Sequence, residues 1–299
     1  MIDSKYLRHT ALLVLLGLAA ACDKGADQPD PAVQEAAVEN VEAMAREHAD
    51  DNPEPSEAVS QEPRRDVTGE RLAYAEVGDE LVYGHFAFPS DMVEPLPAII
   101  MIHEWWGLND NIRAMAERLA GEGYIVLAVD LFGGTTAENP EAARLLMLRA
   151  VEDPAAVSSN IQQAYSFVND TAGAPAIASL GWCFGGGWSL NAAMLLPDEL
   201  DATVIFYGQV TDDEERLRPI QAPILGFFGD EDRGIKIDSV NRFEDALKRL
   251  RKDHQIHIYS GAGHAFANPT GNNYNAEYAE DAWQKTLEFL RANLANNES

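Results

Sequence analysis

Hydrophobic residues are arranged in three different ways along the 299-residue chain. One uninterrupted apolar run, Ala11–Ala21, lies near the N-terminus, and residues 23–65 that follow it are polar and acidic. From about Asp66 onward, short apolar runs alternate with segments whose apolar positions recur at helical spacing. We therefore expect one folded domain over residues 66–299.

The alternating segments predict a sheet flanked by helices. Arg71–Glu76 and Glu80–Pro89 have the pattern of two strands joined by a turn at Val77–Asp79. Leu96–His103 is a continuous apolar run, which is typical of a strand buried on both faces. Later strands are predicted at Tyr124–Val129, Ala176–Leu180, Ala202–Phe206, Ile224–Phe228 and Gln255–Tyr259, and helices at Asn109–Glu122, Pro140–Val151, Ala155–Thr171, Gly185–Leu196, Asp238–Leu250 and Ala276–Leu294. This order predicts an α/β fold with a mostly parallel central sheet and helices on both faces.

Residues 1–22 have the organisation of a signal peptide. Two basic residues precede an apolar run that is too short to span a bilayer but suits the core of an export signal. Ala19 and Ala21 fit ordinary signal cleavage, whereas Leu18–Cys22 resembles a bacterial lipobox in which Cys22 is lipidated. We favour the lipoprotein, periplasmic and anchored at Cys22; a soluble periplasmic or secreted protein is the alternative.

Residues 23–65 carry 12 acidic and 4 basic residues and no aromatic residue. Such a segment cannot bury enough apolar surface to fold alone, so we expect an acidic disordered linker. Ala32–Ala49 could form a transient helix within it. The linker would serve either as a tether or as an inert acidic tail.

The whole chain has a formal net charge of −27. Such a surface repels nucleic acid and anionic lipid headgroups. We therefore expect no nucleic-acid partner, and contact with a membrane only through the N-terminal lipid. A solvated acidic surface explains the charge equally well without any partner.

The segment Gly181–Gly185, Gly-Trp-Cys-Phe-Gly, lies between a predicted strand and a predicted helix. It matches the nucleophile elbow, with Cys183 in place of serine. Side chains two residues before and after the nucleophile would collide in so sharp a turn, so glycine is required there. The N-terminus of the following helix favours a thiolate beside it. A lone cysteine is otherwise often buried core, but the flanking glycines favour a catalytic nucleophile.

Ionisable residues follow nearly every predicted strand, where chemistry gathers in parallel α/β sheets. Asp232 follows one strand and His264 follows the last, which gives the chain order of nucleophile, acid and histidine of an α/β-hydrolase. We expect His264 to be the base and Asp232 its orienting carboxylate. Asp230 and Glu231 are rivals by proximity.

Backbone donors are expected to complete this site. The N–H groups of Phe184 and Trp105 are the predicted oxyanion hole. No Cys, His or Asp cluster has metal-ligand spacing, and no glycine-rich loop indicates a phosphate site. We therefore expect no metal and no cofactor, and a small-molecule ester or lactone as substrate.

Five motifs then point to a known family: HEWWGLN at 103–109, GWCFGG at 181–186, FYG at 206–208, GDED at 229–232 and GAGHAFAN at 261–268. The chain from about Arg71 to Leu294 resembles the dienelactone hydrolase (carboxymethylenebutenolidase) family of α/β-hydrolases. The resemblance implies a Cys183–His264–Asp232 triad that acts through an acyl-enzyme. It also implies that Glu104 contacts the resting nucleophile, is displaced by substrate, and then helps to deprotonate the thiol. A structural contact to its loop is the alternative for Glu104.

The chain departs from this family at the substrate carboxylate. The type enzymes hold it with two arginines, one of them four residues after the histidine, where this chain has Asn268. An amide cannot form the charge-assisted pair of an arginine with a carboxylate. The second arginine is expected within 138–149, where Arg144 and Arg149 are candidates. We expect Tyr207, Asn268 and Arg144 to bind substrate, and the substrate to differ, as an uncharged ester or lactone would.

Two alternatives to a dienelactone hydrolase-like enzyme remain open. A broad-specificity carboxylesterase or thioesterase is favoured by Asn268. A non-catalytic surface lipoprotein would use the fold as a binding module, but such a module has no need of Cys183, His264, Asp232 and Glu104 together.

Overall fold

The computed structural model describes residues 31–51, 53 and 61–295. The expected signal peptide, the lipidation site at Cys22 and the start of the expected linker lie outside the described residues. Within the described part of the chain, no helix is both long enough and apolar enough to cross a membrane.

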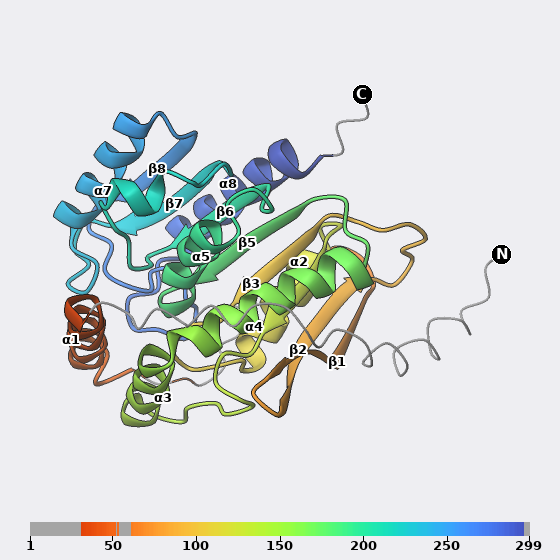
Figure 1. The fold of residues 1–299 in the computed structure, drawn as a ribbon, viewed down its shortest axis with the longest axis horizontal. Coiled ribbons are helices and arrows are strands. Elements are labelled where there is room, and N and C mark those ends of the chain that lie inside the picture. The colour runs from red at the N-terminus through yellow and green to blue at the C-terminus, as the bar shows by residue number, and fades with distance from the viewer. Residues whose placement is uncertain (1–30, 52, 54–60, 296–299) are drawn as a thin grey trace. The chain divides into compact units, whose positions relative to one another are not determined.

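The described residues form one eight-stranded sheet in the order β1-β2-β4-β3-β5-β6-β7-β8 (Figure 1). β1 (Val67–Val77) and β4 (Ile125–Val129) are both antiparallel to β2 (Glu80–Pro89). All other neighbours are parallel, and involve β3 (Ala98–Ile102), β5 (Ile177–Trp182), β6 (Ala202–Phe206), β7 (Ile224–Gly229) and β8 (His254–Tyr259). Every residue of β3 to β7 is buried, as continuous apolar runs predict. The predicted mostly parallel sheet is confirmed.

Helices cover the sheet on both sides. α4 (Pro154–Ser166) and α5 (Phe184–Leu195) lie in front of it in Figure 1. Behind it, α2 (Asp110–Ala120) is joined to α8 (Ala276–Leu294) by the Arg118–Glu280 ion pair of 3.4 Å. The remaining helices after β1 are α3 (Pro140–Glu152), the short α6 (Glu214–Leu217) and α7 (Ile237–Leu250).

Two boundaries differ by more than two residues from the sequence prediction. The single helix predicted at Ala155–Thr171 is α4 followed by a π-helical turn at Phe167–Thr171. β1 begins at Val67, before the predicted start at Arg71. The sequence pattern missed these first residues because they are largely exposed and alternate only weakly between apolar and polar.

The helix α1 (Pro31–Glu47) lies within the stretch that we expected to be a disordered linker. Its residues Val41 and Met44 are buried, and Glu42 forms an ion pair of 2.7 Å with Arg144 of α3. The structure therefore has a packed helix there, whereas the sequence indicated a free segment. An acidic segment poor in apolar residues cannot fold alone, but α1 does not fold alone, because its apolar side chains pack against distant parts of the chain.

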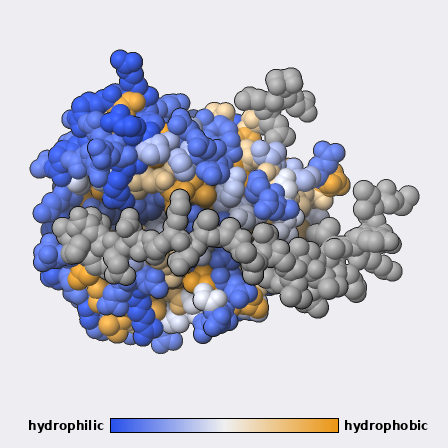
Figure 2. Space-filling view, in the orientation of Figure 1, coloured by the Kyte–Doolittle hydropathy of each residue, from blue (hydrophilic) through white to orange (hydrophobic). Residues whose placement is uncertain are grey.

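The described surface visible in Figure 2 is mostly hydrophilic. Its largest exposed hydrophobic side chains come from separate elements: Leu81, Val93, Leu145, Ile258 and Tyr274. Hydrophobic residues scattered singly in this way are ordinary on a soluble surface.

Candidate active site

Cys183 lies in the sharp turn between β5 and α5. Its backbone has φ +54° and ψ −118°, an uncommon conformation for a residue other than glycine. A Cβ atom added at Gly181 would lie 2.1 Å from the carbonyl oxygen of Gly185. A Cβ atom at Gly185 would lie 2.2 Å from the carbonyl oxygen of Ile102. The turn can therefore form only with glycine on both sides of the cysteine, as the sequence pattern predicts.

His264 and Asp232 come together from the loops that follow β8 and β7. His264 Nδ1 donates a hydrogen bond of 2.7 Å to Asp232 Oδ2, and each side chain is 1% exposed. The other carboxylate oxygen of Asp232 accepts the backbone N–H groups of Gly234 and Ile235, at 2.8 and 2.7 Å. These bonds fix the carboxylate, which in turn fixes the orientation of the imidazole.

The two rival acids do not reach the imidazole. Oδ1 of Asp230 accepts the backbone N–H of Gly261 at 2.6 Å, at an exposed position. Glu231 is exposed, whereas His264 is buried. Among the three neighbouring acids, the structure therefore pairs only Asp232 with His264.

The protonation of His264 depends on two negative neighbours. Burial lowers the pKa of the imidazole, but the charges of Asp232 and Cys183 outweigh burial and hold the pKa well above its usual value. Nε2 of His264 is buried, and a hydrogen-bonding contribution from the Cys183 side chain adds to the raised pKa of the ring. The ring is thus held at Nδ1 by Asp232, while its other nitrogen can exchange a proton with Cys183.

Glu104 follows β3 and is 8% exposed. Its Oε1 accepts the hydroxyl of Tyr207 at 3.4 Å, and its Oε2 accepts the side-chain amide of Asn268 at 2.6 Å. Burial raises the pKa of Glu104 to about 7, against the lowering effects of His264 and Tyr207. This carboxyl group can therefore gain or lose a proton near neutral pH.

Tyr207 contacts Glu104 and does not line the cavity. It is fully buried and has φ +36°, a strained conformation for a tyrosine at the end of β6. Burial, reinforced by the charge of Glu104, raises the pKa of Tyr207 well above its usual value, so the hydroxyl remains a donor. The structure thus shows Tyr207 supporting Glu104, whereas we expected a substrate contact.

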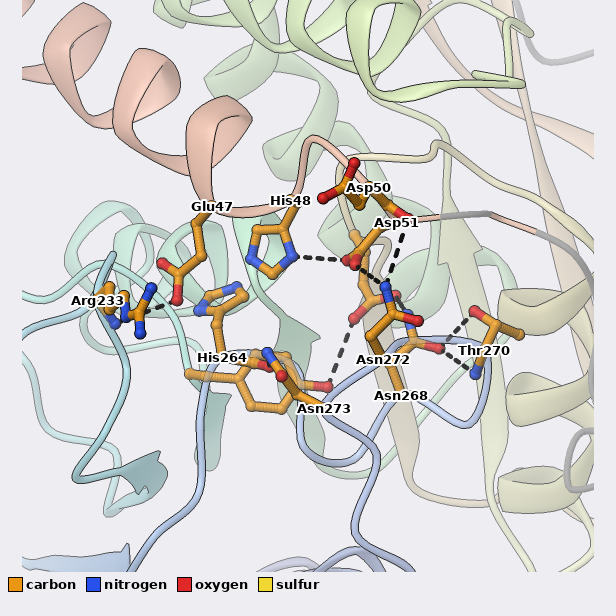
Figure 3. Close-up of polar contacts among 12 residues, drawn as sticks. Glu47, His48, Asp50, Asp51, Arg233, His264, Asn268, Thr270, Asn272 and Asn273 are labelled. Atoms are coloured by element: carbon orange, nitrogen blue, oxygen red, sulfur yellow. Dashed lines mark hydrogen bonds and ion pairs between the residues drawn. The ribbon is translucent and has the colours of Figure 1, made fainter.

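A small cavity is lined by Cys183 and by residues that include His48, His264 and Asn268, which Figure 3 shows. The residues that line it are His48, Asp51, Glu104, Trp105, Trp106, Cys183, His264, Ala265 and Asn268. None of them is a lysine or arginine, and two are acids. The cavity is therefore unsuited to anionic groups.

His48 and Asp51 are cavity residues that the sequence analysis missed. They follow α1, in the stretch that we had expected to be a disordered linker. A sequence signal did exist, because Val41, Met44 and His48 recur at helical spacing and all three are buried.

The expected oxyanion donors are suitably placed in the chain. Phe184 is the first residue of α5, so its backbone N–H has no acceptor within the helix. Trp105 lines the cavity directly after Glu104. His103 has a structural part here: its Nδ1 donates to the Glu104 carbonyl at 2.6 Å, and its Nε2 accepts the N–H of Leu131 at 3.1 Å.

Arg144 does not line the cavity, and the expectation that it binds substrate needs correction. Its guanidinium pairs with Glu42 at 2.7 Å and with Glu141 at 2.9 Å. It therefore ties α3 to α1. Arg149, the other candidate, lines a separate cavity together with Arg71.

In the part of the chain that the structure describes, no group of three or more His, Cys, Asp or Glu side chains could hold a metal ion.

Residues 83–294 match the model of the dienelactone hydrolase family. The chain belongs to this family. A dienelactone hydrolase-like protein named "Putative carboxymethylenebutenolidase" in Saccharolobus solfataricus is 33% identical over 242 residues, covering 69% of this chain and 93% of that protein. A protein of the same name in Escherichia coli (strain K12) is 31% identical over 227 residues, covering 72% and 83%.

Solved structures of dienelactone hydrolases have the same fold. The structure described as "Putative Dienelactone Hydrolase" from Klebsiella pneumoniae has a TM-score of 0.68 at 25% identity, covering 75% of this chain and 98% of that one. A dienelactone hydrolase-like promiscuous phosphotriesterase from metagenomic libraries has a TM-score of 0.70 at 22% identity, covering 77% and 99%. The protein is thus a dienelactone hydrolase-like hydrolase.

Proposed function

We propose that the protein hydrolyses uncharged carboxylic esters or lactones through a thioester intermediate on Cys183. The observation that carries this proposal is the buried His264–Asp232 pair, because His264 lines the same cavity as the cysteine of the elbow and interacts with its sulfur. An imidazole held in one tautomer beside a thiol is the arrangement that nucleophilic acyl transfer requires.

The first half of the reaction forms the acyl-enzyme. Because the pKa of His264 is held well above its usual value, the proton of Cys183 rests on Nε2 of the imidazolium, and the sulfur attacks the carbonyl carbon of the ester as a thiolate. The carbonyl oxygen becomes an oxyanion, which the backbone N–H groups of Phe184 and Trp105 would stabilise. The tetrahedral intermediate then breaks its carbon–oxygen bond, and His264 returns the proton to the leaving alcohol oxygen.

The second half releases the acid. His264 takes a proton from a water molecule, whose oxygen attacks the thioester carbon. The carbon–sulfur bond breaks, which restores the thiolate beside the imidazolium, and the carboxylic acid leaves. Asp232 stabilises the imidazolium in both halves through its bond to Nδ1.

The cavity supports an uncharged substrate. Asp51 and Glu104 both line it, and no lysine or arginine does among the described residues. Asn268 is engaged with Glu104 and carries no charge. A substrate carboxylate would meet two acids and no lysine or arginine, and the His264 imidazolium is already paired with Asp232, so burying that charge would be unfavourable.

Two measurements test this function. Wild type and Cys183→Ala are given a neutral aryl ester and an anionic dienelactone, and intact mass is recorded after rapid quenching. We expect wild type to turn over the neutral ester in preference and to carry the acyl mass, while Cys183→Ala does neither. Equal hydrolysis by both proteins would refute the proposed mechanism.

Chemical labelling gives an independent readout. Iodoacetamide should alkylate Cys183 faster than it alkylates a free thiol near neutral pH, because the thiol lies beside His264 and a helix N-terminus. His264→Gln should slow the labelling. Labelling at the rate of a free thiol would show that Cys183 is not an activated nucleophile, and would favour a non-catalytic binding module.

A further inference from the structure

We propose that His48 is a specificity-determining residue of this active site. The inference rests on the proposed function, because His48 lines the cavity in which the ester would be cleaved. The match to the family model begins only at residue 83, so His48 lies outside it. Part of the substrate preference would therefore be supplied by the segment after α1 and not by the family domain.

His48 packs directly against the reacting groups. Its ring centroid lies 4.9 Å from that of His264, beside it in Figure 3, and both rings meet edge to face. The centroid also lies 5.7 Å from that of Trp105, in a second edge-to-face contact. The His48 side chain is only 3% exposed. The His48 ring thus forms one wall of the cavity, and it would contact a group bound at Cys183 between His264 and Trp105.

Contacts to two other loops fix this wall. His48 Nδ1 donates to Asp51 Oδ2 at 2.6 Å, and the other oxygen of Asp51 accepts the side-chain amide of Asn272 at 3.1 Å. Glu47 accepts the backbone N–H of Arg233 at 3.2 Å, in the loop after β7. The segment is therefore anchored to both loops that carry the His264–Asp232 pair.

The second ring nitrogen of His48 is unused. Nε2 is buried and has no hydrogen-bond partner among the described residues. An unpaired buried nitrogen is unfavourable, and a polar group of a substrate can supply the partner. Because Nδ1 donates to Asp51, Nε2 is the ring nitrogen left for a substrate group. The group that it would recognise is a hydroxyl close to the ester carbonyl, since a hydroxyl can both donate and accept.

Size and polarity together define the substrate class. The cavity is small and is bounded by the rings of His48, Trp105 and His264, which favours short acyl chains. A hydroxyl beside the carbonyl would bond to His48, while a long alkyl chain would collide with its ring. The geometry points to short, uncharged hydroxy esters, or to the corresponding lactones.

The experiment compares three ethyl esters by pH-stat titration: lactate, propanoate and octanoate. Lactate and propanoate differ by one hydroxyl, and propanoate and octanoate by chain length. We expect wild type to prefer lactate over propanoate, and propanoate over octanoate, in kcat/KM. Absence of turnover of all three, with no acyl-enzyme, would contradict the proposed function and not the role of His48 alone.

Two variants then isolate His48. His48→Phe keeps a ring against His264 and Trp105 but removes the nitrogen, so the lactate to propanoate ratio should fall about fivefold. His48→Ala also opens the wall, so the octanoate to propanoate ratio should rise about tenfold. His254→Ala is the matched control, because that ring bonds to the Lys252 carbonyl at the start of β8. Its ratios should equal those of wild type.

The role of His48 is refuted if both ratios stay within twofold of wild type in both His48 variants. Thermal unfolding and the rate of Cys183 alkylation show whether each variant has an intact site. Should His48→Ala fail to fold, His48→Phe still decides the hydrogen-bonding part. If only the octanoate to propanoate ratio changes, Nε2 does not bind the substrate hydroxyl, and the hydrogen-bonding part of the proposal is wrong.

Discussion

The side-chain amide of Asn268 donates a hydrogen bond of 2.6 Å to Oε2 of Glu104, and both residues are buried. The amide cannot turn around, because its oxygen accepts the backbone N–H and the hydroxyl of Thr270 at 2.9 and 2.7 Å. Glu104 is therefore held by a neutral donor at the position where the family resemblance implies an arginine.

Asn268→Arg should move the preference toward anionic esters. The introduced guanidinium would lie beside Glu104 and supply the cation that the cavity lacks. We expect kcat/KM for an anionic dienelactone to rise about tenfold relative to a neutral ester, equivalent to about 1.4 kcal/mol. Asn268→Gln is the control and should leave this ratio unchanged. An equal ratio in both variants would show that charge at this position does not select the substrate.

Asp232→Asn should abolish most of the activity. An amide can donate to Nδ1 of His264 and thereby favour the wrong tautomer, so we expect kcat to fall by about 10³ to 10⁴. Asp230→Asn should have little effect, because that carboxylate only accepts the N–H of Gly261. Comparable losses of kcat in the two variants would indicate that the bond between Asp232 and His264 is not required for catalysis.

Glu104 should make the stability of the protein fall as pH rises. Its pKa is raised from the ordinary 4.5 to about 7, so the folded state binds its proton more tightly than the unfolded chain. Its contribution is fully present below pH 4.5 and is lost as pH rises to about 7, by about 3 kcal/mol at most. Glu104→Gln removes this dependence.

Urea unfolding of wild type and Glu104→Gln at pH 4.5 and pH 8 measures the effect. The free energy of unfolding of the variant, relative to wild type, should be higher at pH 8 than at pH 4.5. A difference that does not vary with pH would mean that Glu104 has an ordinary pKa in the folded protein.

Gly185→Ala should be far more harmful than Gly187→Ala in the same helix. The added Cβ at Gly185 would lie 2.2 Å from a β3 carbonyl oxygen, whereas at Gly187 its nearest neighbour is 3.3 Å away. We expect Gly185→Ala to destabilise the fold by more than about 3 kcal/mol, and Gly187→Ala to change it by less than about 1 kcal/mol. Thermal or urea unfolding measures both. Similar stabilities would contradict the close approach of α5 to β3.

The sequence predicted best the features that depend on local geometry or on strand order. The glycines of the elbow are required by a turn within five residues, and Asp232 and His264 follow adjacent strands of a parallel sheet. Their meeting is a consequence of topology, which the alternation of elements already implies.

The missed features depend on contacts between distant residues. His48 is buried by Trp105 and His264, and nothing near it in the sequence indicates that contact. Arg144 was assigned by position along a helix, but it points at Glu42 of α1. Tyr207 follows a strand like the other site residues, yet its strained backbone places it under Glu104.

The bond between Asp51 and Asn272 joins residues 221 positions apart, so it has a consequence for how the site assembles. Closing so long a loop costs conformational entropy before the contact contributes, so we expect the segment after α1 to dock after the sheet and the His264–Asp232 pair have formed. Backbone amides near residue 48 should then exchange hydrogen faster than those of the central strands. Transient release of this segment would expose the thiol while the rest of the molecule stays folded.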